Sequence, residues 1–181
     1  MSSADTKVVN NHLIIGLGGT GGKIIRDLRK AIAADSRPNP DVNFEYLYLD
    51  SSKELMRTED PTWKVLGRSV QLASSQQLLI EGAGMQQLLQ DVKAYPNIEP
   101  WIGPLDVIQG VARTNVDSAQ GGQRRKFGRF LFACNAKRFV GMLGDRVSEL
   151  RKKKNSTLVT FHVCCGMAGG TGSGSLPDVV A

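Results

Sequence analysis

Glycine clusters at three places in the sequence, and each cluster stands before a segment with helical spacing. Residues 16–22 read G-L-G-G-T-G-G, residues 121 and 122 are both glycine, and residues 166–174 read G-M-A-G-G-T-G-S-G. Glycine loses more conformational entropy on folding than any other residue, so clusters of it need a reason. A turn without side chains lets main-chain N–H groups approach an anion, and a helix N-terminus attracts negative charge. These residues are therefore suited to binding phosphate groups.

The segments beside the glycines predict a parallel α/β sheet. Residues 12–15 and 44–49 read as buried strands, and the apolar residues of 23–33 between them recur at helical spacing. Strand, glycine turn, helix and strand form a βαβ unit. A further strand is predicted over 157–164. Because parallel strands end at the same edge, we expect the glycine turns to converge on one ligand there.

The rest of the chain is less regular. Residues 53–118 read as an insertion-like spacer, in which apolar positions predict a helix over 74–95 that Gly82 and Gly84 interrupt. A long helix is predicted over 129–152, and another is expected to begin at Leu176. That last segment reaches residue 181 without a stop signal. We therefore interpret 1–181 as one nucleotide-binding domain of a longer protein.

Composition narrows the class of protein. The net charge of +6 points to an anionic partner, and much of it lies in residues 124–129 and 151–154. The second group suits the C-terminus of a helix, so nucleic acid is not required to explain the charge. No apolar run is long enough to span a membrane, and the first residues lack the apolar core of a secretory signal. The three cysteines make a poor disulfide set, which favours the cytoplasm.

Two other functions remain open at this point. The first cluster satisfies G-x-G-x-x-G between a strand and a helix, which is typical of a Rossmann-type NAD(P)- or ATP-binding enzyme. Asp50 ends the second strand as a ribose-binding acid does, although it comes later than the usual spacing of about 20 residues. An interaction module with a degenerate nucleotide site is the other alternative. A P-loop is excluded, because no cluster reads G-x-x-x-x-G-K-[ST].

Four motifs resemble the tubulin/FtsZ family. The third cluster is similar to the signature G-G-G-T-G-[ST]-G, with Ala168 in place of its first glycine. The stretches IIGLGGTGGKII, LYLDSS and AQGGQRRKFGR resemble the first, second and third nucleotide loops of that family, in the family's order. Lys23, the long spacer and the basic residues 124–126 depart from FtsZ. The resemblance therefore implies a divergent bacterial tubulin-like protein, with the Rossmann-like sheet and flanking helices of the tubulin/FtsZ GTPase domain.

The resemblance also implies the ligand and the residues that bind it. The ligand is GTP or GDP with Mg²⁺, and Asp50 is the candidate metal ligand near the phosphates. The residues expected against the α- and β-phosphates are Gly18, Gly19, Thr20, Gly21 and Gly22. Those expected around the β/γ end are Gly169, Gly170, Thr171, Gly172 and Ser173. Gly122 and Gln123 are expected to approach the γ-phosphate.

The activity that the resemblance implies is GTP hydrolysis in a cytoskeletal filament. Subunits of this family associate head to tail, and acidic residues of one subunit complete the site of the next. Those acidic residues belong to segments after residue 181 in the family, so no catalytic residue is assigned within this chain. We expect the 181 residues to bind guanine nucleotide without hydrolysing it, and the full-length filament to be a GTPase.

Overall fold

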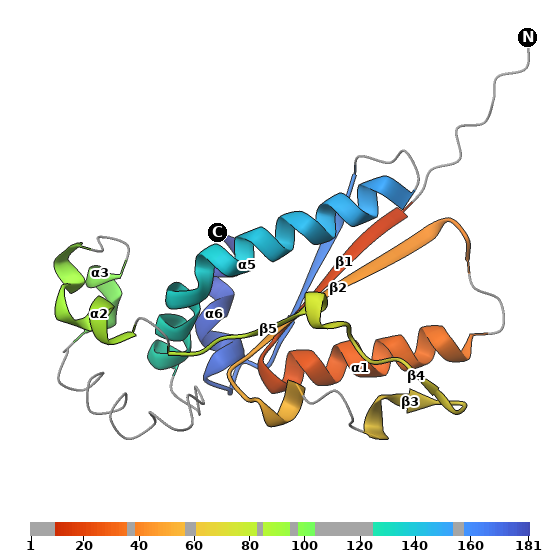
Figure 1. The fold of residues 1–181 in the computed structure, drawn as a ribbon, viewed down its shortest axis with the longest axis horizontal. Helices are drawn as coiled ribbons and strands as arrows, with labels where there is room; N and C mark the ends of the chain where they lie inside the picture. Colours follow the sequence, from red (N-terminus) through yellow and green to blue (C-terminus); the bar gives the residue numbers. More distant parts are fainter. Residues whose placement is uncertain are drawn as a thin grey trace, which may run out of the picture.

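A four-stranded parallel sheet in the order β5-β2-β1-β6 forms the centre of the computed structural model (Figure 1). The structure describes residues 10–35, 39–56, 61–82, 85–94, 98–103, 125–153 and 158–181. The strands are β1 (Asn10–Leu17), β2 (Val42–Asp50), β5 (Gln77–Leu79) and β6 (Thr160–Cys165). All three pairings within the sheet are parallel. The predicted Rossmann-like α/β sheet is thus confirmed.

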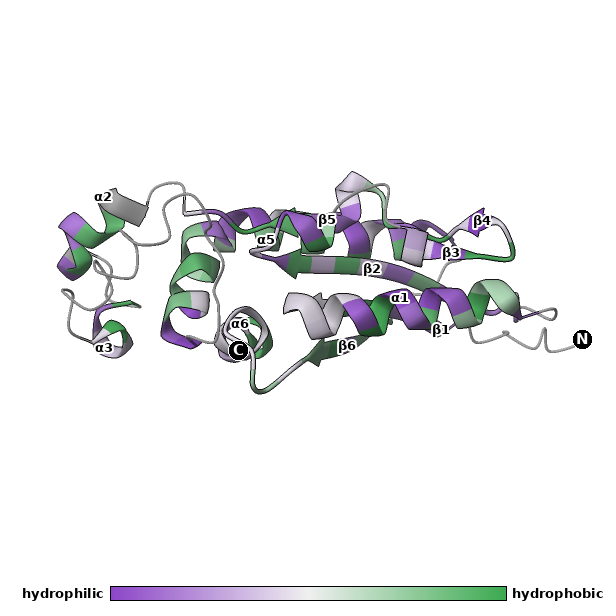
Figure 2. Cartoon of the chain, turned by 90° about the horizontal axis from the view of Figure 1, so that it is seen from below, coloured by the Kyte–Doolittle hydropathy of each residue, from purple (hydrophilic) through white to green (hydrophobic). Residues whose placement is uncertain are grey.

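The two faces of the sheet bury separate apolar clusters. Leu13 and Ile15 of β1 point toward α5 (Arg125–Lys153), whereas Ile14 points toward α1 (Gly18–Ala34). Successive side chains of a strand alternate between faces, so a strand covered on both sides must be apolar along its length. In Figure 2 the part of β2 that leads toward the glycine turns is largely hydrophobic, while α1 and α5 mix hydrophobic and hydrophilic residues.

Helices begin earlier than the sequence pattern indicated. α1 begins at Gly18 instead of residue 23, α5 at Arg125 instead of 129, and α6 (Thr171–Val180) at Thr171 instead of Leu176. The pattern fails here because glycine carries no apolar side chain that could mark a helical face. Most of the first glycine cluster and the end of the third are therefore first turns of helices. Their leading N–H groups have no partner within the helix.

The predicted helix over 74–95 is wrong in its first half. Residues 77–79 instead form β5, which pairs with β2 in the register Tyr48↔Gln77 to Asp50↔Leu79. Leu78 and Ile80 are fully buried, and β5 forms one edge of the sheet. The remaining elements between β2 and α5 are short. They are η1 (Glu54–Met56), η2 (Pro61–Trp63), β3 (Lys64–Val65), β4 (Arg68–Ser69), η3 (Ser74–Gln76), α2 (Met85–Gln90), η4 (Val92–Ala94) and α3 (Glu99–Ile102).

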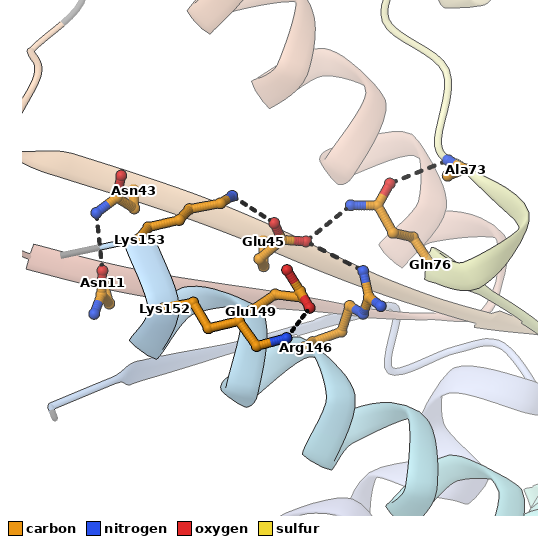
Figure 3. A network of polar contacts seen from close by, with 9 residues as sticks. All are labelled: Asn11, Asn43, Glu45, Ala73, Gln76, Arg146, Glu149, Lys152 and Lys153. Atoms are coloured by element: carbon orange, nitrogen blue, oxygen red, sulfur yellow. Dashed lines mark hydrogen bonds and ion pairs between the residues drawn. The ribbon is translucent and has the colours of Figure 1, made fainter. Parts of the chain in front are cut away.

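The buried carboxylate of Glu45 joins the sheet to α5 (Figure 3). Glu45 of β2 accepts a hydrogen bond from Lys153 Nζ at 2.6 Å and one from Gln76 Nε2 at 3.1 Å. Arg146 Nη1 lies 3.6 Å from the same carboxylate, and only 15% of the Arg146 side chain is exposed. The network fixes the C-terminal half of α5 against β2, at the end of the sheet away from the glycine turns.

No helix in the described part of the chain combines the length and the hydropathy that crossing a membrane requires.

Candidate functional site

The first and third glycine clusters lie side by side, as the sequence predicted. They follow β1 and β6, which are adjacent and parallel, so both turns emerge at one edge of the sheet. A Cβ atom on Gly18 would lie 2.9 Å from the main-chain nitrogen of Gly172 and 3.5 Å from Thr171 Cβ. Gly18 also has a φ of +69°, a conformation that other residues rarely adopt. Only glycine at position 18 lets the two backbones meet this closely.

A pocket of about 120 Å³ opens between these two turns. Six of the nine residues around it are glycine, so its wall is mainly backbone. The residues that line it are Leu17, Gly18, Gly19, Thr20, Gly166, Gly169, Gly170, Thr171 and Gly172. The first turns of α1 and α6 both contribute to this wall, and neither of these fully described helices has an acidic residue there. Free N–H groups and two positive helix ends therefore face one space, which is an environment for an anion.

The predicted phosphate-binding residues fall into three groups according to where they lie. Seven of them line the pocket: Gly18, Gly19, Thr20, Gly169, Gly170, Thr171 and Gly172. Gly21, Gly22 and Ser173 are buried behind it, and the Ser173 hydroxyl donates to the Gly169 carbonyl. Gly122 and Gln123 lie outside the described residues. Sequence reasoning missed Leu17 and Gly166, although each stands directly beside a predicted glycine turn.

Asp50 is buried beneath the first turn of α1 with both carboxylate oxygens engaged. Oδ2 accepts the Tyr48 hydroxyl at 2.6 Å, while Oδ1 accepts the N–H groups of Ser51 at 2.7 Å and Ser52 at 3.2 Å. The side chain is 3% exposed, and this burial raises the pKa of Asp50, while the three donors act to lower it. The carboxylate therefore organises the turn that follows β2.

The role of Asp50 as a direct Mg²⁺ ligand stays a prediction. Mg²⁺ demands octahedral oxygen ligands and usually keeps several waters. A carboxylate has about four lone-pair sites, and three protein donors occupy sites on Asp50, two on Oδ1 and one on Oδ2. A nucleotide-bound Mg²⁺ would take most of its ligands from phosphate and water, with at most one from Asp50.

Thr171 is the first residue of α6 and joins this helix to the turn after β2. Its hydroxyl lies 2.8 Å from the Ser51 hydroxyl, and both residues are buried. The sequence predicted a phosphate contact for the Thr171 hydroxyl. In the structure that hydroxyl bonds to Ser51, and the residue lines the pocket beside Gly170 and Gly172.

The N-terminal half of α5 holds the third cluster from the other side. Arg129 makes a two-bond ion pair with Asp178 of α6 at 2.8 and 2.6 Å, and its guanidinium lies 4.3 Å from the centre of the Trp101 ring. Arg125 donates to the Met167 carbonyl at 2.9 Å, within the glycine cluster itself. Arg125 and Arg129 thus tie α5 to the pocket wall and to α6.

Comparison with known proteins decides the family. The sequence model of the family described as "Tubulin like" matches residues 13–181, nearly the whole chain and all the motifs above that the structure describes. The chain belongs to the tubulin-like family. No curated protein sequence matches this tubulin-like chain.

A solved structure supports the fold of the tubulin-like chain. CetZ1 from Haloferax volcanii, solved as a GDP-bound monomer, matches with a TM-score of 0.56 and 17% sequence identity. The match covers 93% of this chain but 36% of CetZ1, so the tubulin-like chain spans about a third of that protein's length. At this identity the likeness establishes a shared fold.

Replacing Asp50 by asparagine should leave the tubulin-like chain at least as stable as the wild type at pH 7. The raised pKa means that ionised Asp50 is disfavoured in the folded state, a cost that asparagine avoids while keeping hydrogen bonds to the same groups. The advantage should shrink as the pH falls through the raised pKa, and it should be gone below the ordinary value of 3.8. Urea unfolding across this pH range measures the effect. A marked loss of stability in D50N at pH 7 would contradict it.

Proposed function

We propose that this tubulin-like chain binds guanine nucleotides, with the phosphates in the pocket between α1 and α6. The observation that carries the proposal is the meeting of two helix N-termini and two glycine turns around one space. Such an arrangement stabilises the negative charge of a polyphosphate. The GDP in the CetZ1 structure, which has the same fold, favours guanosine phosphates as the ligand.

In this proposal each glycine turn meets one part of the nucleotide. Gly18, Gly19 and Thr20 lie against the α- and β-phosphates, with Gly21 and Gly22 buried behind them. Gly169 to Gly172 surround the β/γ end, with Ser173 behind them. Gly122 and Gln123 approach the γ-phosphate from the segment before α5. The base is read by residues beyond 181, and Mg²⁺ arrives with the phosphates.

We further propose that hydrolysis requires a second subunit. Phosphoryl transfer depends on a group that orients the attacking water. The pocket is lined by leucine, glycine and threonine, and none of these described residues is an acid or a base. In the full-length protein, head-to-tail association in a cytoplasmic filament brings acidic residues of the next subunit to the γ-phosphate. The free thiols of the three cysteines suit that reducing compartment.

Titration with labelled GTP, GDP, ATP and NAD tests the proposal. GTP and GDP should bind, with ATP and NAD weaker. Replacing Gly170 and Thr171 by valine together should abolish guanine-nucleotide binding. A hydrolysis assay should detect turnover by the full-length protein and none by residues 1–181. Preference for NAD, or guanine-nucleotide affinity that survives the double replacement, would favour the Rossmann-type enzyme, and binding of no nucleotide would favour an interaction module.

A further inference from the structure

A continuous path of buried polar contacts runs beneath the pocket from β2 to α6. It begins at Tyr48, which is 1% exposed and donates its hydroxyl to Asp50 Oδ2 at 2.6 Å. Asp50 Oδ1 in turn holds the main-chain N–H of Ser51, whose hydroxyl lies 2.8 Å from that of Thr171. The path thus connects the middle of the sheet to the first residue of α6.

α1 is shaped to admit the tyrosine. A Cβ atom on Gly22 would lie 2.6 Å from the Tyr48 hydroxyl oxygen, closer than side-chain atoms approach. Glycine at position 22 therefore leaves the space in which the hydroxyl reaches Asp50. This gives Gly22 a purpose that differs from direct contact with a phosphate.

The direction of the first hydrogen bond is fixed. Burial raises the pKa of the Tyr48 hydroxyl far above its usual range, and the negative charge of Asp50 raises it further. The hydroxyl thus keeps its proton at neutral pH and acts as the donor, because the ionised carboxylate can only accept. A hydrogen bond to a charged acceptor is among the stronger ones in a protein.

We infer that Tyr48 is a positioning residue of the nucleotide site, acting through Asp50 and Ser51 on Thr171. Tyr48 fixes the carboxylate, the carboxylate fixes the turn at 50–52, and Ser51 holds the first turn of α6 at its distance from α1. The shape of the pocket depends on that distance, because Thr171 and Gly172 of α6 and Gly18 and Gly19 of α1 together form part of its wall. The inference rests on the proposed function for its ligand, but the linkage itself belongs to the chain.

Tyr48→Phe tests the inference, with Tyr46→Phe as the matched control. Tyr46 lies two residues earlier on β2, on the same face and 5% exposed, with the Arg29 guanidinium 4.6 Å from its ring centre. The charged groups that act on its hydroxyl are Arg29 and Glu45. We expect Y48F to lose about tenfold in GDP affinity, the fold-change that corresponds to the loss of one hydrogen bond to a charged group, and Y46F to stay within about twofold. Ser51→Ala should match Y48F, and the double variant should be little worse than either, because both break one path.

Amide hydrogen exchange of residues 171–174 without nucleotide separates this inference from the proposed function. In Y48F and S51A these amides should exchange faster than in wild type and Y46F, whether or not any nucleotide binds. If Y48F and S51A exchange faster but the wild-type protein binds no guanine nucleotide, the linkage is retained and the proposed function is overturned. Unchanged exchange, or GDP affinity equal in Y48F and Y46F, would overturn the inference.

Discussion

Replacing Gly18 by alanine should weaken guanine-nucleotide binding by about a hundredfold. The residue has a φ of +69°, which costs an alanine roughly 1–2 kcal/mol. The new Cβ would also lie 2.9 Å from the main-chain nitrogen of Gly172, and such overpacking costs about 1–3 kcal/mol. Because the contact is with backbone, relief requires moving the two turns apart. The free variant can relieve this strain by moving the turns apart, and closing them around the nucleotide then restores it. A factor of ten in affinity corresponds to about 1.4 kcal/mol, so restoring these costs on binding weakens it about a hundredfold.

Gly144→Ala is the matched control for G18A. Gly144 lies on the exposed side of α5, and a Cβ there would meet nothing within 4 Å. Alanine inside a helix is favoured over glycine by about 0.5–1 kcal/mol, so G144A should raise the melting temperature slightly and leave nucleotide affinity unchanged. Isothermal titration and thermal unfolding of both variants measure the contrast. Wild-type affinity in G18A would refute the pocket as the nucleotide site.

Replacing Glu45 by alanine should lower the free energy of unfolding by about 3 kcal/mol. Removing one partner of a buried ion pair leaves the other charge uncompensated, which costs roughly 3–5 kcal/mol. We expect the lower end of this range, because Lys153 is 43% exposed and water can replace its lost partner. Arg146 stays largely buried, and it accounts for the cost that remains. The melting temperature should fall by roughly 6–12 °C for a chain of this size. Glu45 lies five residues before Asp50 on β2, about 16 Å along the strand, so nucleotide affinity should persist.

Glu149→Ala provides the comparison for E45A. Glu149 pairs with Lys152 on the exposed side of α5, where both side chains are largely in water (Figure 3). Exposed pairs contribute little to stability, so E149A should unfold at the wild-type temperature. Equal stability of E45A and E149A would show that the Glu45 network does not hold α5 to the sheet.

Local patterns in the sequence predicted the parts of the fold that depend on residues close together in the chain. The runs around β1 and β2 are largely apolar, because strands covered on both faces must be. The run around β6 also predicted a strand, although β6 lies at the edge of the sheet and its first three residues are exposed. β5 escaped prediction, because a strand of three residues is defined by its pairing with β2 and not by its own composition. The starts of α1 and α6 were missed for a related reason, since a glycine has no side chain to reveal which way it faces.

The sequence by itself determined which backbone could hold phosphates and where it would gather. The glycine clusters stand after strands that a βαβ pattern makes parallel, and parallel strands end together. Tertiary structure alone decided what the side chains between them do. The sequence left the protein contacts of Asp50 open, and burial under α1 beside Tyr48, which Gly22 admits, gave its carboxylate a donor within the protein. Such a contact depends on the packing of segments far apart in the chain, and that packing is settled only when the whole domain has folded.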